Sequence, residues 1–89
     1  MQLPEPVVSE VRNRLRRVAG QVQGVERMLD EGRDCREIVA QISAATKALE
    51  KAGFRVVAEG LTYCLQSPDD ARADGYDVEV VQKMFMRLA

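Results

Sequence analysis

Apolar residues recur in alternating steps of three and four along the first third of the chain. The positions are Val8, Val11, Leu15, Val18, Val22, Val25 and Leu29. A heptad pattern of this kind is typical of a helix that buries one seam against other helices. Pro6 suits a first helical turn, and Gly32 suits a C-terminal cap. The pattern predicts a long helix from about residue 7 to the segment 30–32.

A second stretch, residues 34–65, carries the same period. Its apolar and small positions are Cys35, Ile38, Ile42, Ala45, Leu49, Ala52 and Val56. Asp34 followed by Glu37 is a capping-box pattern, which predicts that the helix begins here with Cys35 in its first turn. Only Arg33 separates the two helix caps, so the helices should form a tight antiparallel hairpin. Gly20 and Gly24 on one face, and Gly53 in the second helix, indicate close approach of a neighbour or a kink.

The remaining chain predicts a connection and one more helix. The run SPDDARADG is rich in acids, with room for a single turn around residues 69–72. Asp77 then caps a last helix, whose seam is Val78, Val81, Phe85 and Leu88. No strand signal or internal repeat is present. We therefore predict one all-α domain over residues 1–89, with two long antiparallel helices and a short third, dimerising into a helical bundle.

The composition of the chain favours oligomerisation, and its lack of targeting features favours the cytoplasm. The chain has 89 residues, no tryptophan and 4% aromatic residues, so its core must be small and aliphatic. We expect oligomerisation to bury the additional apolar surface that such a small core needs for stability. The N-terminus lacks the features of a signal peptide, and no apolar run approaches the length of a membrane span. We expect a cytoplasmic protein without a membrane partner.

Charge is distributed unevenly on a chain whose net charge is only −1. Between Arg12 and Arg55 ten basic residues face six acidic ones, a surplus of four. In an antiparallel hairpin the arginines of the first helix can merge with a basic edge of the second: Arg12, Arg14, Arg16, Arg17, Lys47, Lys51 and Arg55. Such a surface suits phosphate groups. The alternative is a set of solvated faces balanced by Glu10, Glu26 and Glu50.

The two cysteines are the candidate chemistry. Cys64 follows Cys35 by 29 residues, which is about 44 Å along one helix, far beyond the reach of a disulfide. The thiols can meet if two copies of the helix pack antiparallel. The helix N-terminus, Arg33 and Arg36 favour a Cys35 thiolate, and Asp34 opposes it. Two buried, inert cysteines are the alternative, and the chain has no histidine for a metal site or for catalysis.

The run RLRRVAGQVQGVERMLDEGRDCREIVAQISAATKAL resembles the CsoR/RcnR (DUF156) family of bacterial repressors, through R-x-x-G-Q and D-C-x-x-[IV]-x-x-Q-[IL]. The resemblance implies a homotetramer, built as a dimer of dimers, that binds double-stranded operator DNA. It assigns the DNA contacts to Arg14, Arg16, Arg17 and Lys51. The edge of positive charge adds Arg55. Copper sensors of this family place a histidine four residues before the second cysteine, where this chain has Gly60.

Two cysteines without histidine look most like the CstR branch, which senses persulfides and polysulfides. By this resemblance Cys35 accepts sulfane sulfur and Cys64 of the partner resolves it, and the crosslink releases the DNA. The alternative within the family is a Cu(I)-responsive repressor that uses Cys35 and Cys64 as ligands. A further alternative is a helical interaction protein with structural cysteines. No catalytic constellation is visible, so we expect neither an enzyme nor a cofactor.

Overall fold

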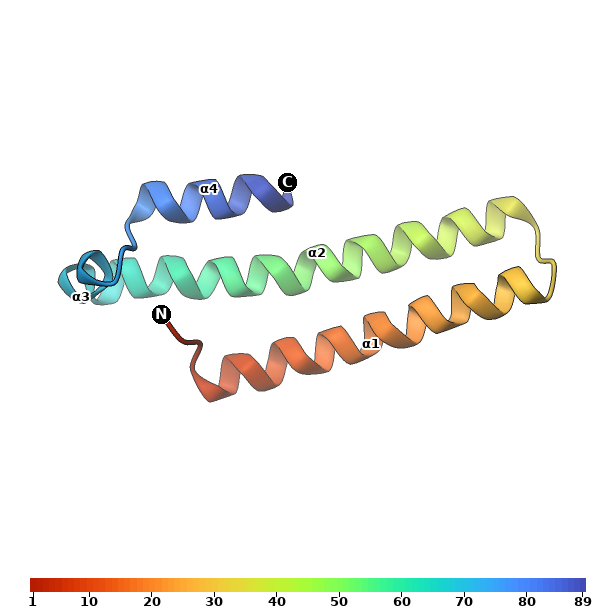
Figure 1. The fold of residues 1–89 in the computed structure, drawn as a ribbon, viewed down its shortest axis with the longest axis horizontal. Helices are drawn as coiled ribbons and strands as arrows, with labels where there is room; N and C mark the ends of the chain where they lie inside the picture. The colour runs from red at the N-terminus through yellow and green to blue at the C-terminus, as the bar shows by residue number, and fades with distance from the viewer.

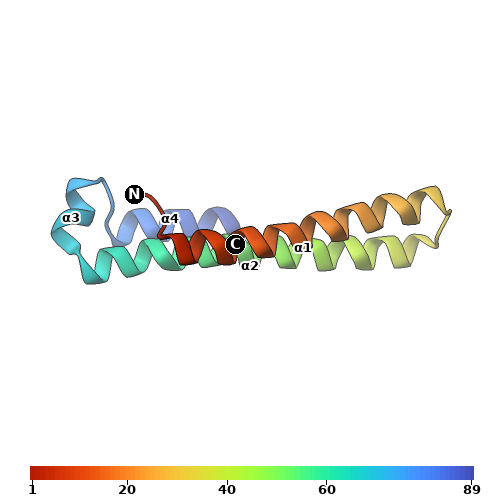
Figure 2. The same ribbon diagram turned by 90° about the horizontal axis from the view of Figure 1, so that it is seen from below.

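The computed structural model describes all residues, 1–89, as four helices without strands. They are α1 (Glu5–Asp30), α2 (Cys35–Gln66), α3 (Pro68–Ala73) and α4 (Val78–Leu88). α1 and α2 form an antiparallel hairpin, and α4 lies on the opposite side of α2 from α1 (Figure 1). The molecule is a thin rod of 55 × 25 × 14 Å, with α3 at the end remote from the α1–α2 turn in both views (Figure 2). The all-α prediction is confirmed.

The α1–α2 turn forms where the caps predicted it. Gly32 takes a left-handed φ of 67° just after α1, a conformation that glycine adopts without strain. The Asp34 side chain accepts a hydrogen bond from the Arg36 backbone N–H at 3.1 Å and caps α2. The predicted reciprocal half of a capping box is not made, because the Glu37 carboxylate binds Arg33 instead.

The heptad positions of α1 fall into two groups that differ in burial. Val18 is buried, and Val11 and Val25 are half-buried. By contrast, Leu15, Val22 and Leu29 are exposed by 44%, 47% and 60%. On α2, three further apolar residues are similarly open: Val39, Ile42 and Leu49. A hollow of about 210 Å³ runs between the two helices beside Val22, Ile42 and Leu49. The protomer therefore leaves a long apolar face uncovered.

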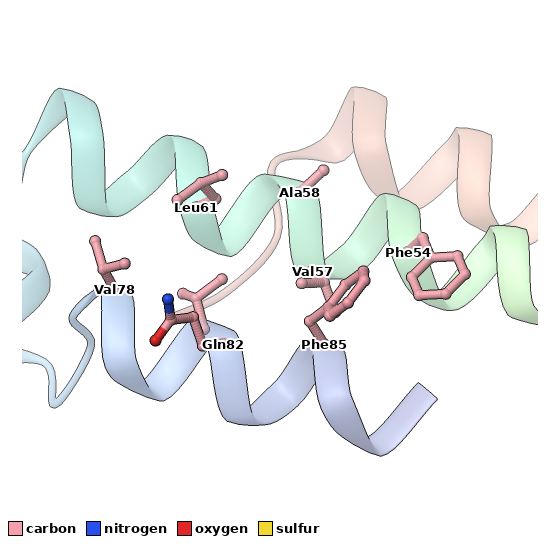
Figure 3. A pocket seen from close by; sticks show the side chains of 8 residues that line it. Phe54, Val57, Ala58, Leu61, Val78, Gln82 and Phe85 are labelled. Carbon is pink, nitrogen blue, oxygen red and sulfur yellow. The ribbon is translucent and has the colours of Figure 1, made fainter. Parts of the chain in front are cut away.

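The compact core lies around the second half of α2. Val57, Cys64, Ala71 and Val81 form a buried cluster, joined by half-buried Tyr63, Tyr76, Met84 and Leu88. Of the predicted seam of α4, Val81 is buried, whereas Val78 and Phe85 remain about half exposed. These two residues border an apolar groove of about 440 Å³ with Phe54 and Leu61 of α2 (Figure 3).

The glycines show where helices approach closely. A Cβ at Gly53 would lie 2.8 Å from a Leu88 methyl carbon, so the predicted close crossing is formed by α4. No neighbouring helix of the same chain meets Gly20 or Gly24, so the close approach predicted there is absent within the protomer. The segment after α2 contains a helix of six residues, α3, where the sequence predicted a connection with a single turn around residues 69–72. No helix has both the length and the hydropathy needed to cross a membrane.

Candidate nucleic-acid interface and thiol pair

The hairpin brings basic residues of both long helices to one cleft. The cleft has a volume of about 330 Å³ and is lined by Arg14, Arg17, Gln21, Ala44, Lys47, Ala48 and Lys51. Antiparallel packing places residues 44–51 of α2 beside residues 14–21 of α1, so the two clusters merge as the sequence predicted. Arg16 is exposed and lies outside this cleft.

The charges in the cleft are not neutralised within the chain. The ion pairs of the protomer involve other basic groups: Arg33, Arg36, Arg55, Arg72, Lys83 and the N-terminal ammonium. The carboxylates expected to balance the cluster therefore do not pair with Arg14, Arg17, Lys47 or Lys51. In addition, Arg14 Nε and Gln21 Oε1 are buried without a hydrogen-bond partner. Buried polar atoms without a partner are unusual in a folded chain.

Arg55 differs from the other basic residues. Its guanidinium pairs with Glu10 of α1 and Glu59 of α2, and these hydrogen bonds, that of Glu59 foremost, raise the Arg55 pKa. Desolvation opposes the shift. Arg55 therefore ties the two helices together and adds little net positive charge to the cleft.

The thiols lie at opposite ends of α2. Cys35 is exposed at its first residue, and Cys64 is buried two residues before its last. Both are free, and no cluster of three or more potential ligands exists within the protomer. The two cysteines of one chain therefore cannot bridge to each other or share one metal ion.

The surroundings of Cys35 differ from the sequence-based prediction. Arg33 binds Glu31 and Glu37, and Arg36 binds Asp34, so carboxylates offset the two positive charges expected to activate Cys35. Cys64 lies under α3, against Ala71.

Sequence reasoning missed two groups of residues around these sites. Gln21 follows Arg14 by seven residues and therefore shares its helix face, so the spacing could have revealed it. Tyr63 and Tyr76 beside Cys64 carry no comparable signal, because their meeting depends on how α3 folds back. Burial, followed by the charges of Asp74 and Asp70, raises the Tyr63 pKa.

Comparison with known proteins places this geometry in a family. A family model described as a metal-sensitive transcriptional repressor matches residues 8–87. The copper-sensing transcriptional repressor RicR of Mycobacterium tuberculosis is 44% identical over 52 residues, which cover 58% of this chain and 54% of that protein. The copper-sensing transcriptional repressor CsoR of Bacillus subtilis is 30% identical over 78 residues, covering 83% of this chain and 77% of that protein.

A third relative, the uncharacterized protein YrkD of Bacillus subtilis, is 36% identical over 39 residues, covering 44% of this chain and 62% of that protein. The matched segment thus spans about half the length of the mycobacterial repressor. No solved structure matches the chain. The match over residues 8–87 covers nearly the whole fold, including the cleft and both cysteines. The chain therefore belongs to the CsoR/RcnR family of metal-sensitive transcriptional repressors.

Proposed function

We propose that this protein represses transcription by binding duplex DNA through the cleft between α1 and α2. The observation that carries the proposal is the group of four basic side chains, Arg14, Arg17, Lys47 and Lys51, on one hollow without carboxylate partners. Binding of phosphates to such residues releases counterions and gives salt-dependent affinity. Arg16 extends the surface along α1, whereas Arg55 serves chiefly to hold the hairpin together.

The DNA proposal is tested on a duplex selected from a random library by the wild-type protein. Arg14→Gln and Lys51→Gln should each weaken binding about tenfold and reduce the slope of log affinity against log salt by about one. Lys83→Gln is the matched control, since Lys83 lies on α4 and pairs with Glu79. Equal affinities and slopes for all three variants would favour an interaction protein without a DNA role.

The inducer is proposed to act on Cys35 of one subunit and Cys64 of its partner. The uncovered apolar residues of α1 and α2, among them Leu15, Leu29 and Leu49, support association of protomers. Antiparallel packing of α2 on the partner's α2 brings the opposite ends of the two helices together. Each dimer then has two places where Cys35 and Cys64 approach one another.

Cu(I) is the inducer that the relatives support, because two of them are named as copper-sensing repressors. Thiolates are soft ligands and select Cu(I) over harder ions. Cys35 of one chain and Cys64 of the other would supply two such ligands. No group of three His, Cys, Asp or Glu side chains forms a metal site within the protomer, and the site proposed here consists of these two thiolates between subunits.

Reactive sulfur is the second candidate, favoured by the complete absence of histidine. A persulfide would transfer its outer sulfur to the Cys35 thiolate and release its parent thiolate. The Cys64 thiolate of the partner would then attack the inner sulfur of this persulfide, Cys35 Sγ. A disulfide forms between the chains, and the outer sulfur leaves as hydrosulfide, which takes up the two electrons.

One experiment separates the two inducers. The protein–DNA complex is titrated under anaerobic conditions with Cu(I), delivered from a competing chelator, and separately with glutathione persulfide. Release by Cu(I) without a crosslink supports the copper proposal. Release by persulfide with an interchain crosslink, absent in Cys35→Ser and in Cys64→Ser, supports the sulfur proposal. Mass spectrometry of the crosslinked dimer counts the bridging sulfur atoms. No release by either reagent would contradict both.

A further inference from the structure

α3 covers the thiol that the proposed switch requires. Cys64 is only 8% exposed and Ala71 of α3 only 1%, and both belong to the same buried cluster. α3 folds back at the end of α2, where the chain turns toward α4 (Figures 1 and 2). α3 therefore limits the access of a partner's thiol to Cys64 from this end of the rod.

A small set of contacts holds α3 down. The Tyr63 hydroxyl donates a hydrogen bond to the Asp70 carbonyl oxygen at 3.1 Å. The Tyr63 and Tyr76 rings meet edge to face, with centroids 6.1 Å apart. The Tyr76 backbone N–H in turn binds the Ala71 carbonyl oxygen at 2.8 Å. Tyr63, the residue next to Cys64, thus contacts the chain both within α3 and just after it.

The same segment has features that permit it to open. α3 has only six residues, and Ser67 at its start provides no side-chain cap. A helix this short is not stable by itself. Gly75 at its exit has a φ of 84°. A hollow of about 200 Å³ is lined by Cys64 together with residues of α3 and of the segment after it: Pro68, Ala71, Arg72, Tyr76, Asp77 and Val78.

We propose that α3 is a lid over Cys64, held by Tyr63, that must lift before Cys64 can react. The inference rests on the proposed function for the identity of the partner thiol, and it adds an order of events. Exposed Cys35 reacts first, and Cys64 reacts only in the fraction of molecules whose lid is open. A crosslink at Cys64 then holds α3 away from its place on α2, so the state of the thiol is coupled to the position of α3.

The test measures how fast N-ethylmaleimide alkylates Cys64 in a Cys35→Ser background, without DNA or inducer. Relative to the same thiol in urea-unfolded protein, alkylation in the folded protein should be at least tenfold slower. Tyr63→Phe removes only the hydroxyl and should accelerate alkylation about fivefold, equivalent to one hydrogen bond of about 1 kcal/mol. Ala71→Gly, which removes a packed methyl group and weakens α3, should accelerate it as well.

Tyr76→Phe is the matched control, because the Tyr76 hydroxyl makes no hydrogen bond while its ring contacts Tyr63. Its rate should equal that of the background protein. Rapid alkylation of Cys64 in the folded background protein would overturn the proposal, as would equal rates in Tyr63→Phe, Ala71→Gly and Tyr76→Phe. Because the assay contains neither DNA nor inducer, the lid can fail while the repressor proposal stands, and the reverse.

Discussion

At the scale of single residues, the partner of a charge decides its role. Arg14 and Arg55 both lie along the hairpin, and both are arginines in a basic stretch. Arg14 has a buried nitrogen without a hydrogen-bond partner, whereas Arg55 is held by Glu10 and Glu59. An arginine that is already paired must give up its carboxylates before it can bind phosphate. The two residues should therefore respond differently to substitution.

Arg55→Gln should lower the urea midpoint of unfolding while leaving DNA affinity within about threefold of wild type. Arg14→Gln should do the reverse, with little change in the midpoint and a loss of affinity of about tenfold. Urea unfolding followed by circular dichroism and fluorescence anisotropy on a labelled duplex measure the two effects. If Arg55→Gln weakened DNA binding as much as Arg14→Gln, Arg55 would be a DNA contact after all.

The Arg33–Glu37 pair gives a pH dependence to the start of α2. The hydrogen bond from Arg33 lowers the Glu37 pKa below its ordinary value of 4.5. Because the folded-state pKa is depressed, this contribution is present above pH 4.5 and is lost as the pH falls through the lowered pKa. NMR titration of the Glu37 carboxyl carbon should show an increase of its pKa toward the ordinary value in Arg33→Gln. Arg72→Gln, at the other end of the rod, should leave it unchanged.

At the scale of elements, α2 organises the molecule. Its second half is covered by α3 and α4 on the side that carries Gly53, Gly60 and Cys64. Its first half leaves Val39, Ile42 and Leu49 open. Two glycines lie where α4 comes closest, and they differ in how much room a side chain would have.

Gly60→Ala should stabilise the fold by about 0.4–1 kcal/mol, since alanine restricts the unfolded chain and favours helix. Its Cβ would lie 3.6 Å from Met84 and 3.7 Å from Val81, which are ordinary contacts. Gly53→Ala should gain less, because its Cβ would lie 2.8 and 2.9 Å from the Leu88 methyl carbons and would have to displace them. Urea unfolding at equal protein concentrations compares the two. A larger gain for Gly53→Ala would contradict the packing of α4.

Much of this element structure could be predicted from the sequence, because it is locally encoded. The hairpin follows from the heptad pattern, Gly32 and Asp34, which act within a few residues. The missing half of the capping box was not predictable, since Arg33 and the N-cap backbone compete for the same Glu37 carboxylate. The side of α4 that is buried depends on Met84 and Leu88 meeting α2, a contact between distant segments. For the same reason the cover over Cys64 could not be predicted.

The candidate sites divide in the same way. The merging of Arg14 and Arg17 with Lys47 and Lys51 follows from antiparallel geometry, and the structure places these four side chains together as expected. The pairing of Arg55 was missed, because Glu10 is 45 positions away along the chain. Charge counts along the sequence do not reveal which carboxylate an arginine will bind.

At the scale of the whole molecule, the protomer is a rod with one uncovered apolar side. If two α2 helices pack antiparallel so that Cys35 faces Cys64 of the partner, residues whose numbers sum to 99 lie opposite each other. Leu49, which is 51% exposed, then lies next to the two-fold axis and close to its own copy. This arrangement can be checked without the native thiols.

In a Cys35→Ser, Cys64→Ser background, Leu49→Cys should form a covalent dimer in high yield with a short bismaleimide. Ala40→Cys is the matched control, because Ala40 is also exposed but lies nine residues away, on the opposite side of the helix. It should give little dimer. Gel electrophoresis quantifies both products. Efficient crosslinking at Ala40 with none at Leu49 would require a different face of α2 at the interface.

The tight turn sets Cys35 at one tip of a 55 Å rod, with Cys64 near the other. If two chains respond through these thiols as proposed, this placement determines the stoichiometry of the response. A two-fold symmetric dimer has two equivalent thiol pairs, one at each end. Each pair consists of one sulfur from each chain. Two chains crosslinked at one end can still separate at the other end. Only a second crosslink closes the two chains into a covalent ring. The amount of inducer would then determine the ratio of singly to doubly crosslinked dimers.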